Sequence, residues 1–80
     1  MTKEKETELI MQLAEDVAPF VRDVESGIKT TRNNYGRYGA MLTRLSKGNK
    51  RMAMILGYAM MQAGANGRGV HDALQAFFPE

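Results

Sequence analysis

Few of the side chains that perform chemistry in proteins occur in this sequence, and their spacing assembles no reactive set. His71 is the only histidine and there is no cysteine, which removes thiolate chemistry, disulfides and cysteine-rich zinc sites. Glu4 and Glu8 lie four residues apart, but no histidine near them completes a metal site. No serine can be placed beside a base. We therefore expect no catalytic residues, no metal and no cofactor, and a protein that is not an enzyme.

Charged residues are distributed very unevenly along the chain. The formal net charge is +2, yet residues 1–25 hold seven acidic and three basic side chains, and residues 26–71 hold eight basic side chains and no acidic one. A long basic segment suits a phosphate backbone, because each neutralised phosphate releases a condensed counterion. The alternative is that the acidic start of the chain packs beside the basic middle, so that the charges pair within the fold or between subunits.

The basic segment supplies the candidate residues for binding an anion or a partner. In residues 30–39, TTRNNYGRYG, tyrosines and arginines alternate with glycine and asparagine, which suits stacking on bases with guanidinium groups on phosphate. In the competing interpretation, the two tyrosines begin a helical core stripe that continues at Leu42 and Leu45. The predicted binding set is Arg32, Tyr35, Arg37, Tyr38, Arg44, Lys47, Lys50, Arg51 and Arg68.

A glycine-rich stretch, residues 65–69 (ANGRG), precedes the last predicted helix. Its backbone amides and Arg68 suit a phosphate or a carboxylate. However, the stretch follows a helix and lacks the spacing of a P-loop or a dinucleotide fingerprint, so a simple connector is the favoured interpretation. It is also longer than the turn of a helix-turn-helix, and Asp72 would repel phosphate, which disfavours a major-groove reader.

Apolar residues recur every three or four positions, which predicts an all-α fold, a small bundle of four or five helices. The first stripe runs from Ile10 to Ile28 and predicts one long helix. An interior proline removes a backbone hydrogen bond and clashes with the preceding turn, so we expect a kink near Pro19.

The second predicted helix follows a capping Thr31 and ends at a turn over residues 46–49. Gly36 and Gly39 either weaken it or delay its start, because glycine costs about 1 kcal/mol relative to alanine in a helix interior. The last predicted helix starts near Val70 and stops at Pro79. Its apolar face comprises Val70, Ala73, Leu74, Phe77 and Phe78.

The third predicted helix, residues 50–63, is apolar on nearly all sides. Asn49 suits its N-cap, and Gly64 suits the left-handed residue that ends it. Such a helix lies at the centre of a bundle or shares one face with another chain. Because methionine adapts to irregular surfaces, we predict that the face formed by Met54, Tyr58 and Met61 contacts another subunit or a partner. The other apolar face comprises Met52, Ile55, Leu56, Ala59 and Ala63.

Length and composition set the class of the protein. Eighty residues predict one helical domain, 1–80, and the 44% hydrophobic and 25% charged residues are typical of a globular chain. So small a core leaves roughly 3–5 kcal/mol of stability, which makes a homo-oligomer our expectation. No signal-peptide pattern and no membrane-spanning stretch is found, so we expect a cytoplasmic protein that does not contact membranes.

Two functions fit these patterns. The first is a small non-enzymatic regulator or inhibitor that docks on another protein through its Met-rich apolar and basic surfaces. The alternative is a nucleic-acid or nucleotide binder that uses residues 29–51 with Arg68. We rank the protein partner first because elements that read bases are missing. The patterns leave open the partner's identity, any base specificity and the size of the oligomer.

Overall fold

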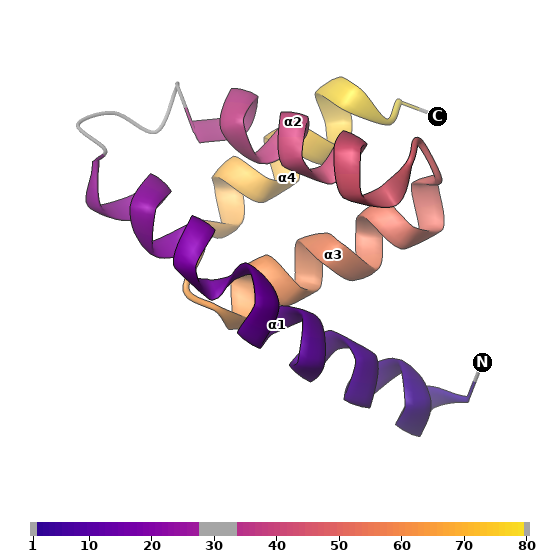
Figure 1. The fold of residues 1–80 in the computed structure, drawn as a ribbon. Coiled ribbons are helices and arrows are strands. Elements are labelled where there is room, and N and C mark those ends of the chain that lie inside the picture. The colour runs from indigo at the N-terminus through magenta and orange to yellow at the C-terminus, as the bar shows by residue number, and fades with distance from the viewer. Residues whose placement is uncertain (1, 28–33, 80) are drawn as a thin grey trace.

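The computed structural model describes residues 2–27 and 34–79, and in these ranges it contains four helices and no strand (Figure 1). The predicted all-α bundle is thereby confirmed. The helices are α1 (Lys3–Ser26), α2 (Asn34–Ser46), α3 (Lys50–Gln62) and α4 (Gly67–Phe77).

Thr2 caps the start of α1, because its side chain accepts a hydrogen bond from the backbone N–H of Lys5 at 3.2 Å. The helix continues unbroken through Pro19 to Ser26, and the kink that we expected there is not confirmed. The side chain of Pro19 is exposed. Pro19 has no backbone N–H to donate to the carbonyl of Glu15. Because Pro19 lies on the exposed side of the helix, this carbonyl faces solvent, which can donate in its place.

α2 begins at Asn34 and includes both of its glycines, so the delayed start that we considered at Gly39 is wrong. The expected cap, Thr31, lies outside the described residues. Gly39 has a packing role: a Cβ atom there would lie 2.2 Å from Cε1 of Phe77. The ring of Phe77 rests on the bare backbone of α2, and this close approach joins α2 to α4.

The two glycines of α2 are expected to respond in opposite ways to alanine. Gly39→Ala should lower the free energy of unfolding by about 1–2 kcal/mol net, because the new methyl group overlaps the Phe77 ring by more than helix propensity recovers. Gly36→Ala is the matched control, since a Cβ atom there meets nothing within 4 Å. It should raise stability by up to about 1 kcal/mol. Urea unfolding of both variants measures the difference, and equal effects would contradict the Phe77 contact.

The buried side of α2 differs from the predicted stripe at its end. Tyr38 and Leu42 are fully buried, as the core interpretation predicts, but Leu45 is 42% exposed. Ser46, four residues after Leu42, takes the next buried position instead. Tyr38, Leu42 and Ser46 are spaced four residues apart, so their side chains lie on one face of α2. The side chain of Leu45 lies next to that face and is partly exposed.

α3 has the boundaries that its capping residues predict. The Asn49 side chain accepts a hydrogen bond from the backbone N–H of Met52 at 2.9 Å, and Gly64 follows the helix with a φ of +104°. The predicted turn before it is also present, with Lys47 and Gly48 at φ values of 55° and 80°. Left-handed backbone at these points reverses the direction of the chain before and after α3.

α4 begins earlier than we predicted, at Gly67 instead of Val70. Asn66 caps it, because its side chain accepts a hydrogen bond from the backbone N–H of Gly69 at 3.0 Å. Residues 67–69 therefore form the first helical turn and not a loop. The cap outweighs the low helix propensity of two glycines, and the helix ends at Phe77, just before Pro79.

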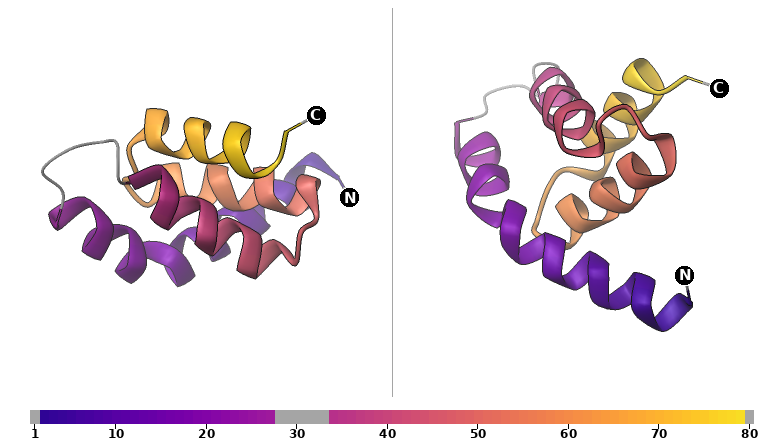
Figure 2. Two further views of the ribbon diagram at one scale, coloured as in Figure 1. Left: turned by 90° about the horizontal axis from the view of Figure 1, so that it is seen from above. Right: turned by 45° about the vertical axis from the view of Figure 1, so that its right-hand side comes forward.

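The helices form two pairs, with α3 in contact with all three others. α1 packs mainly on α3, and α2 packs mainly on α4; Figure 2 shows α3 between α1 and the α2–α4 pair. No described helix has the length and apolar character that crossing a bilayer requires. The buried core comprises Val17, Val21, Val24, Tyr38, Leu42, Leu56, Met60, Ala65, Val70 and Ala73.

Candidate partner-binding site

A groove of about 540 Å³ lies between α3 and α4. On α3 it is lined by the three residues that were predicted to form a contact face. Met54 is 41% exposed, Tyr58 is 48% exposed and Met61 is 39% exposed. Of the other predicted face of α3, Ile55, Leu56 and Ala59 are buried, and Met52 and Ala63 are half-buried against the core. The sequence did not predict the second wall, which Val70 and Leu74 of α4 form with Phe78, the residue that follows α4.

Gly57 brings the two walls together. A Cβ atom at Gly57 would lie 3.2 Å from side-chain atoms of both Val70 and Leu74, so the absence of a side chain lets α4 approach α3 closely. At the C-terminal end of α3, the sulfur of Met61 lies close to Gly67, the first residue of α4. α3 and α4 therefore run antiparallel, and their closest approach forms the floor of the groove.

A few polar residues lie at the edge of the groove. Lys50 and His71 line it, and no carboxylate is among its described lining residues. Arg68 lies three residues before His71 on α4 and is exposed. Asp72 approaches His71, with its carboxylate oxygen 3.6 Å from Nδ1, but it does not line the groove. The site therefore has an apolar floor with polar residues at its edge.

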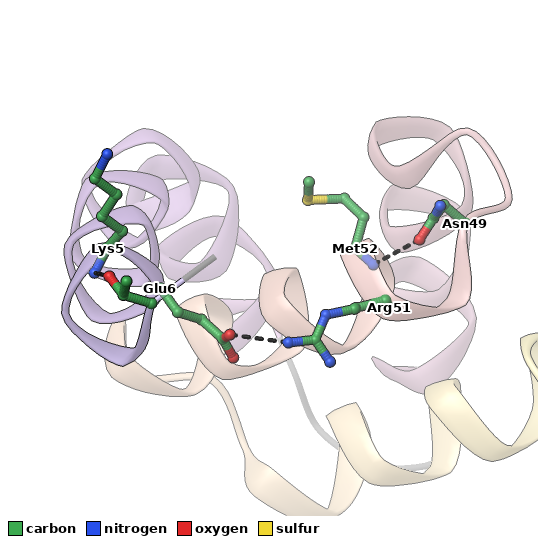
Figure 3. A network of polar contacts seen from close by, with 6 residues as sticks. Lys5, Glu6, Asn49, Arg51 and Met52 are labelled. Carbon is green, nitrogen blue, oxygen red and sulfur yellow. Dashed lines mark hydrogen bonds and ion pairs between the residues drawn. The ribbon is translucent and has the colours of Figure 1, made fainter.

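Two of the other predicted basic residues pair with acids of α1. Arg37 lies 2.7 Å from the carboxylate of Asp23, and its guanidinium stands 5.8 Å from the centre of the Phe20 ring. Arg51 reaches from α3 to Glu6, with 3.0 Å between the charged atoms (Figure 3). These residues fit the alternative in which the acidic first helix neutralises the basic segment. Exposed pairs of this kind contribute about 0–1 kcal/mol each.

The remaining predicted cations, Arg44 and Lys47, lie in two different hollows. Arg44 is exposed on α2 beside Met41, and Lys47 is exposed in the turn between α2 and α3. Neither has an ion-pair partner in the part of the chain that the structure describes. Arg32 and the side chain of Tyr35 lie outside that part. Arg44 lines a shallow hollow together with Arg37, and Lys47 lines another together with Arg51. The predicted anion-binding set is thus divided among separate places on the molecule.

Tyr38 belongs to the core and not to a binding surface. It is fully buried, its ring meets the ring of Phe20 edge-on at 5.9 Å, and its hydroxyl donates a hydrogen bond to the carboxylate of Glu25. Burial raises the pKa of Tyr38, and the hydrogen bond and negative charge of Glu25 raise it further, while the charge of Arg37 acts in the opposite direction. The tyrosine therefore stays neutral and donates.

Glu25 is the polar residue that sequence reasoning missed. The oxygen that accepts from Tyr38 also accepts from the backbone N–H of Asn66 at 3.0 Å. One carboxylate at the end of α1 thereby joins α2 to the connection between α3 and α4. The only signal in the sequence is that Glu25 directly follows Val24, a core residue of α1.

Comparison with known proteins does not assign a function. No protein-family model, curated protein or solved structure matches this chain. Within residues 2–27 and 34–79, no three side chains of the metal-binding types come together to hold an ion. The groove and its charges are therefore the features from which a function is inferred.

Proposed function

We propose that this protein is a non-enzymatic binding protein, a regulator or inhibitor, that docks on another protein through the groove between α3 and α4. One observation carries the proposal: the three large exposed apolar side chains of α3 line the same groove as the apolar row of α4. Contiguous exposed apolar surface marks interaction sites, and tyrosine and methionine are enriched where proteins grip partners.

The core does not need these residues. α3 already buries Ile55, Leu56, Ala59 and Met60 on the side that faces the other helices. Met54, Tyr58 and Met61 add no buried contact comparable to those, yet they expose apolar area to water. A partner that covers them would gain roughly 25 cal/mol for each Å² of apolar surface removed from water.

Binding to nucleic acid is the weaker candidate. Arg37 and Arg51 pair with α1, and Tyr38 is buried, so three of the residues predicted to meet an anion have partners within the chain. Self-association is the other way to cover the groove, in which case the partner is a second copy. Both alternatives are outcomes of the experiment below.

The test is affinity capture from the native cell with the immobilised wild-type protein and groove variants. Tyr58→Glu and Met61→Glu should each reduce the captured partner at least tenfold, because a buried carboxylate without a pair is costly. Met11→Glu is the matched control, since Met11 is 53% exposed on α1, away from the groove. It should retain the partner, and circular dichroism should be the same for all variants.

Three results would contradict docking on a different protein. Nuclease treatment that releases the captured material would favour the nucleic-acid alternative. Equal capture by wild type and Tyr58→Glu would place the contact outside the groove. Light scattering at micromolar concentration that shows a dimer in the wild type and a monomer in Tyr58→Glu would make a second copy the partner.

A further inference from the structure

We infer that the hollow between the end of α2 and the first turns of α3 binds phosphate, as the free ion or as a small phosphate monoester. This hollow is separate from the groove between α3 and α4, and its role goes beyond the proposed docking function. Three features of the described chain support the inference: a buried hydroxyl without a partner, a lysine without an ion pair, and the N-terminus of a helix.

The hollow has a volume of about 410 Å³ and lies beside the turn that joins the two helices. Ser46 and Ile55 are its buried lining residues, at 5% and 3% exposed, and they form its floor. Lys47, Asn49 and Arg51 line it with polar side chains, and no carboxylate is among the described residues that line it. The lining is therefore suited to a small anion.

The hydroxyl of Ser46 is the buried group that needs a partner. Its Oγ is the one buried side-chain polar atom of the described residues without a hydrogen bond. A serine or threonine in a helix often donates to the carbonyl four residues earlier. Thr43 of the same helix does so, with 2.8 Å from its Oγ1 to the carbonyl oxygen of Gly39, and Ser46 does not. Because an unpaired buried hydroxyl destabilises a fold, this position favours an acceptor from outside the chain.

Lys47 supplies the positive charge of the site. Its side chain is exposed, lines the hollow and makes no ion pair within residues 2–27 and 34–79. Arg51 contributes less, because its guanidinium reaches across to Glu6 at 3.0 Å (Figure 3). The site therefore has one cation that is not neutralised, next in sequence to the unpaired hydroxyl.

The N-terminus of α3 adds backbone donors to the same hollow. Asn49 caps this helix of 13 residues, and its side chain accepts from the N–H of Met52. The earlier N–H groups of a helix have no acceptor within it, and the aligned peptide dipoles make this end partly positive. Phosphate carries several strong acceptor oxygens. Rotation about the Cα–Cβ bond of Ser46 directs its hydroxyl to one of them, while Lys47 and the helix end meet the others.

Thermal unfolding of the full chain in sodium phosphate, beside sodium chloride of equal ionic strength, tests the inference. Phosphate should raise the Tm of the wild type in a saturable manner, since a ligand that binds only the folded state stabilises it. Lys47→Gln should need about fivefold more phosphate for the same shift. Arg44→Gln is the matched control, because Arg44 is an exposed cation of α2 in a different hollow, and it should respond like the wild type.

Two further readouts locate the ion and identify its form. On titration with phosphate, the backbone amide NMR signal of Arg51 should shift and that of Met11, on α1, should not. Phenyl phosphate, a simple monoester, is compared with the inorganic ion. Half-saturation at a lower concentration of phenyl phosphate would assign the site to a phosphorylated molecule, and the reverse order would assign it to free phosphate.

Ser46→Ala separates a hydroxyl that binds an anion from one that supports the fold. Without phosphate, the variant should have a Tm about 4–8 °C above that of the wild type, because an unpaired buried hydroxyl is gone and alanine favours the helix. In saturating phosphate, its Tm should rise by less than half as much as that of the wild type.

Three results would overturn the inference. Equal Tm shifts in phosphate and in chloride would show that no specific site exists. Equal weakening by Lys47→Gln and Arg44→Gln would show an adventitious ion only, held by general positive charge. A Ser46→Ala variant less stable than the wild type without phosphate would show that the hydroxyl is satisfied inside the protein. None of these results depends on the groove between α3 and α4, so the docking proposal is tested separately.

Discussion

Replacing Glu25 with alanine is expected to lower the free energy of unfolding by about 2–5 kcal/mol, because two donors lose their acceptor at once. The Tyr38 hydroxyl and the Asn66 backbone N–H both donate to the same carboxylate oxygen, and the Tyr38 side chain is fully buried. An unsatisfied buried donor costs about 1–3 kcal/mol. A loss of this size is comparable to the whole stability of a domain of this length. Chemical unfolding followed by circular dichroism measures it.

A mutant cycle isolates the cause. Tyr38→Phe in the Glu25→Ala background should recover part of the loss, because the orphaned hydroxyl is then absent, with a coupling of about 0.5–3 kcal/mol. Glu25→Gln should cost less than Glu25→Ala, since the amide oxygen still accepts a hydrogen bond. Glu15→Ala is the control, because Glu15 is an exposed carboxylate on the same helix. Similar unfolding curves for Glu25→Ala and Glu15→Ala would show that the Glu25 junction carries little stability.

Replacing Pro19 with alanine is expected to raise the free energy of unfolding by about 1–3 kcal/mol. Proline in a helix interior costs about 3 kcal/mol, because it lacks the N–H that would bond the carbonyl of Glu15 and its ring crowds the preceding turn. Pro19 is exposed in the middle of α1, so little packing is lost with its ring. The more restricted unfolded chain of the wild type offsets about 0.4–1 kcal/mol of the gain.

Urea unfolding of Pro19→Ala beside Gln12→Ala measures this gain. Gln12 is an exposed residue of α1 with a helix propensity close to that of alanine, so its substitution should change stability by less than about 0.5 kcal/mol. A Pro19→Ala variant no more stable than Gln12→Ala would mean that the packing of α1 on α3 depends on the local backbone geometry that proline imposes.

The pairing of charges gives α1 a second role beside its part in the core. Asp23 and Glu6 sit near opposite ends of α1 and meet Arg37 of α2 and Arg51 of α3. The acidic first helix therefore neutralises part of the basic segment. The net charge of one segment thus describes the surface poorly, because two of its arginines pair with carboxylates of another helix.

Local patterns in the sequence determined the existence of the four helices and both ends of α3. The three- and four-residue spacing of apolar residues depends only on neighbours along the chain, as does the capping by Asn49 and Gly64. The exposed face of α3 was also predictable, because Met54, Tyr58 and Met61 lie on one side of a helix whose other side is equally apolar. When a helix with two apolar faces packs in a small bundle, one face is buried against the other helices and the second stays exposed to solvent.

Only the tertiary structure decided which side chains from different helices meet. The Phe77 ring on Gly39, the α4 wall of the groove, and the carboxylate of Glu25 between Tyr38 and Asn66 all join residues far apart in the sequence. Such contacts depend on the rotation and crossing of whole helices. The helical period shows which residues lie on the same side of one helix. It does not show which side of another helix will pack against them.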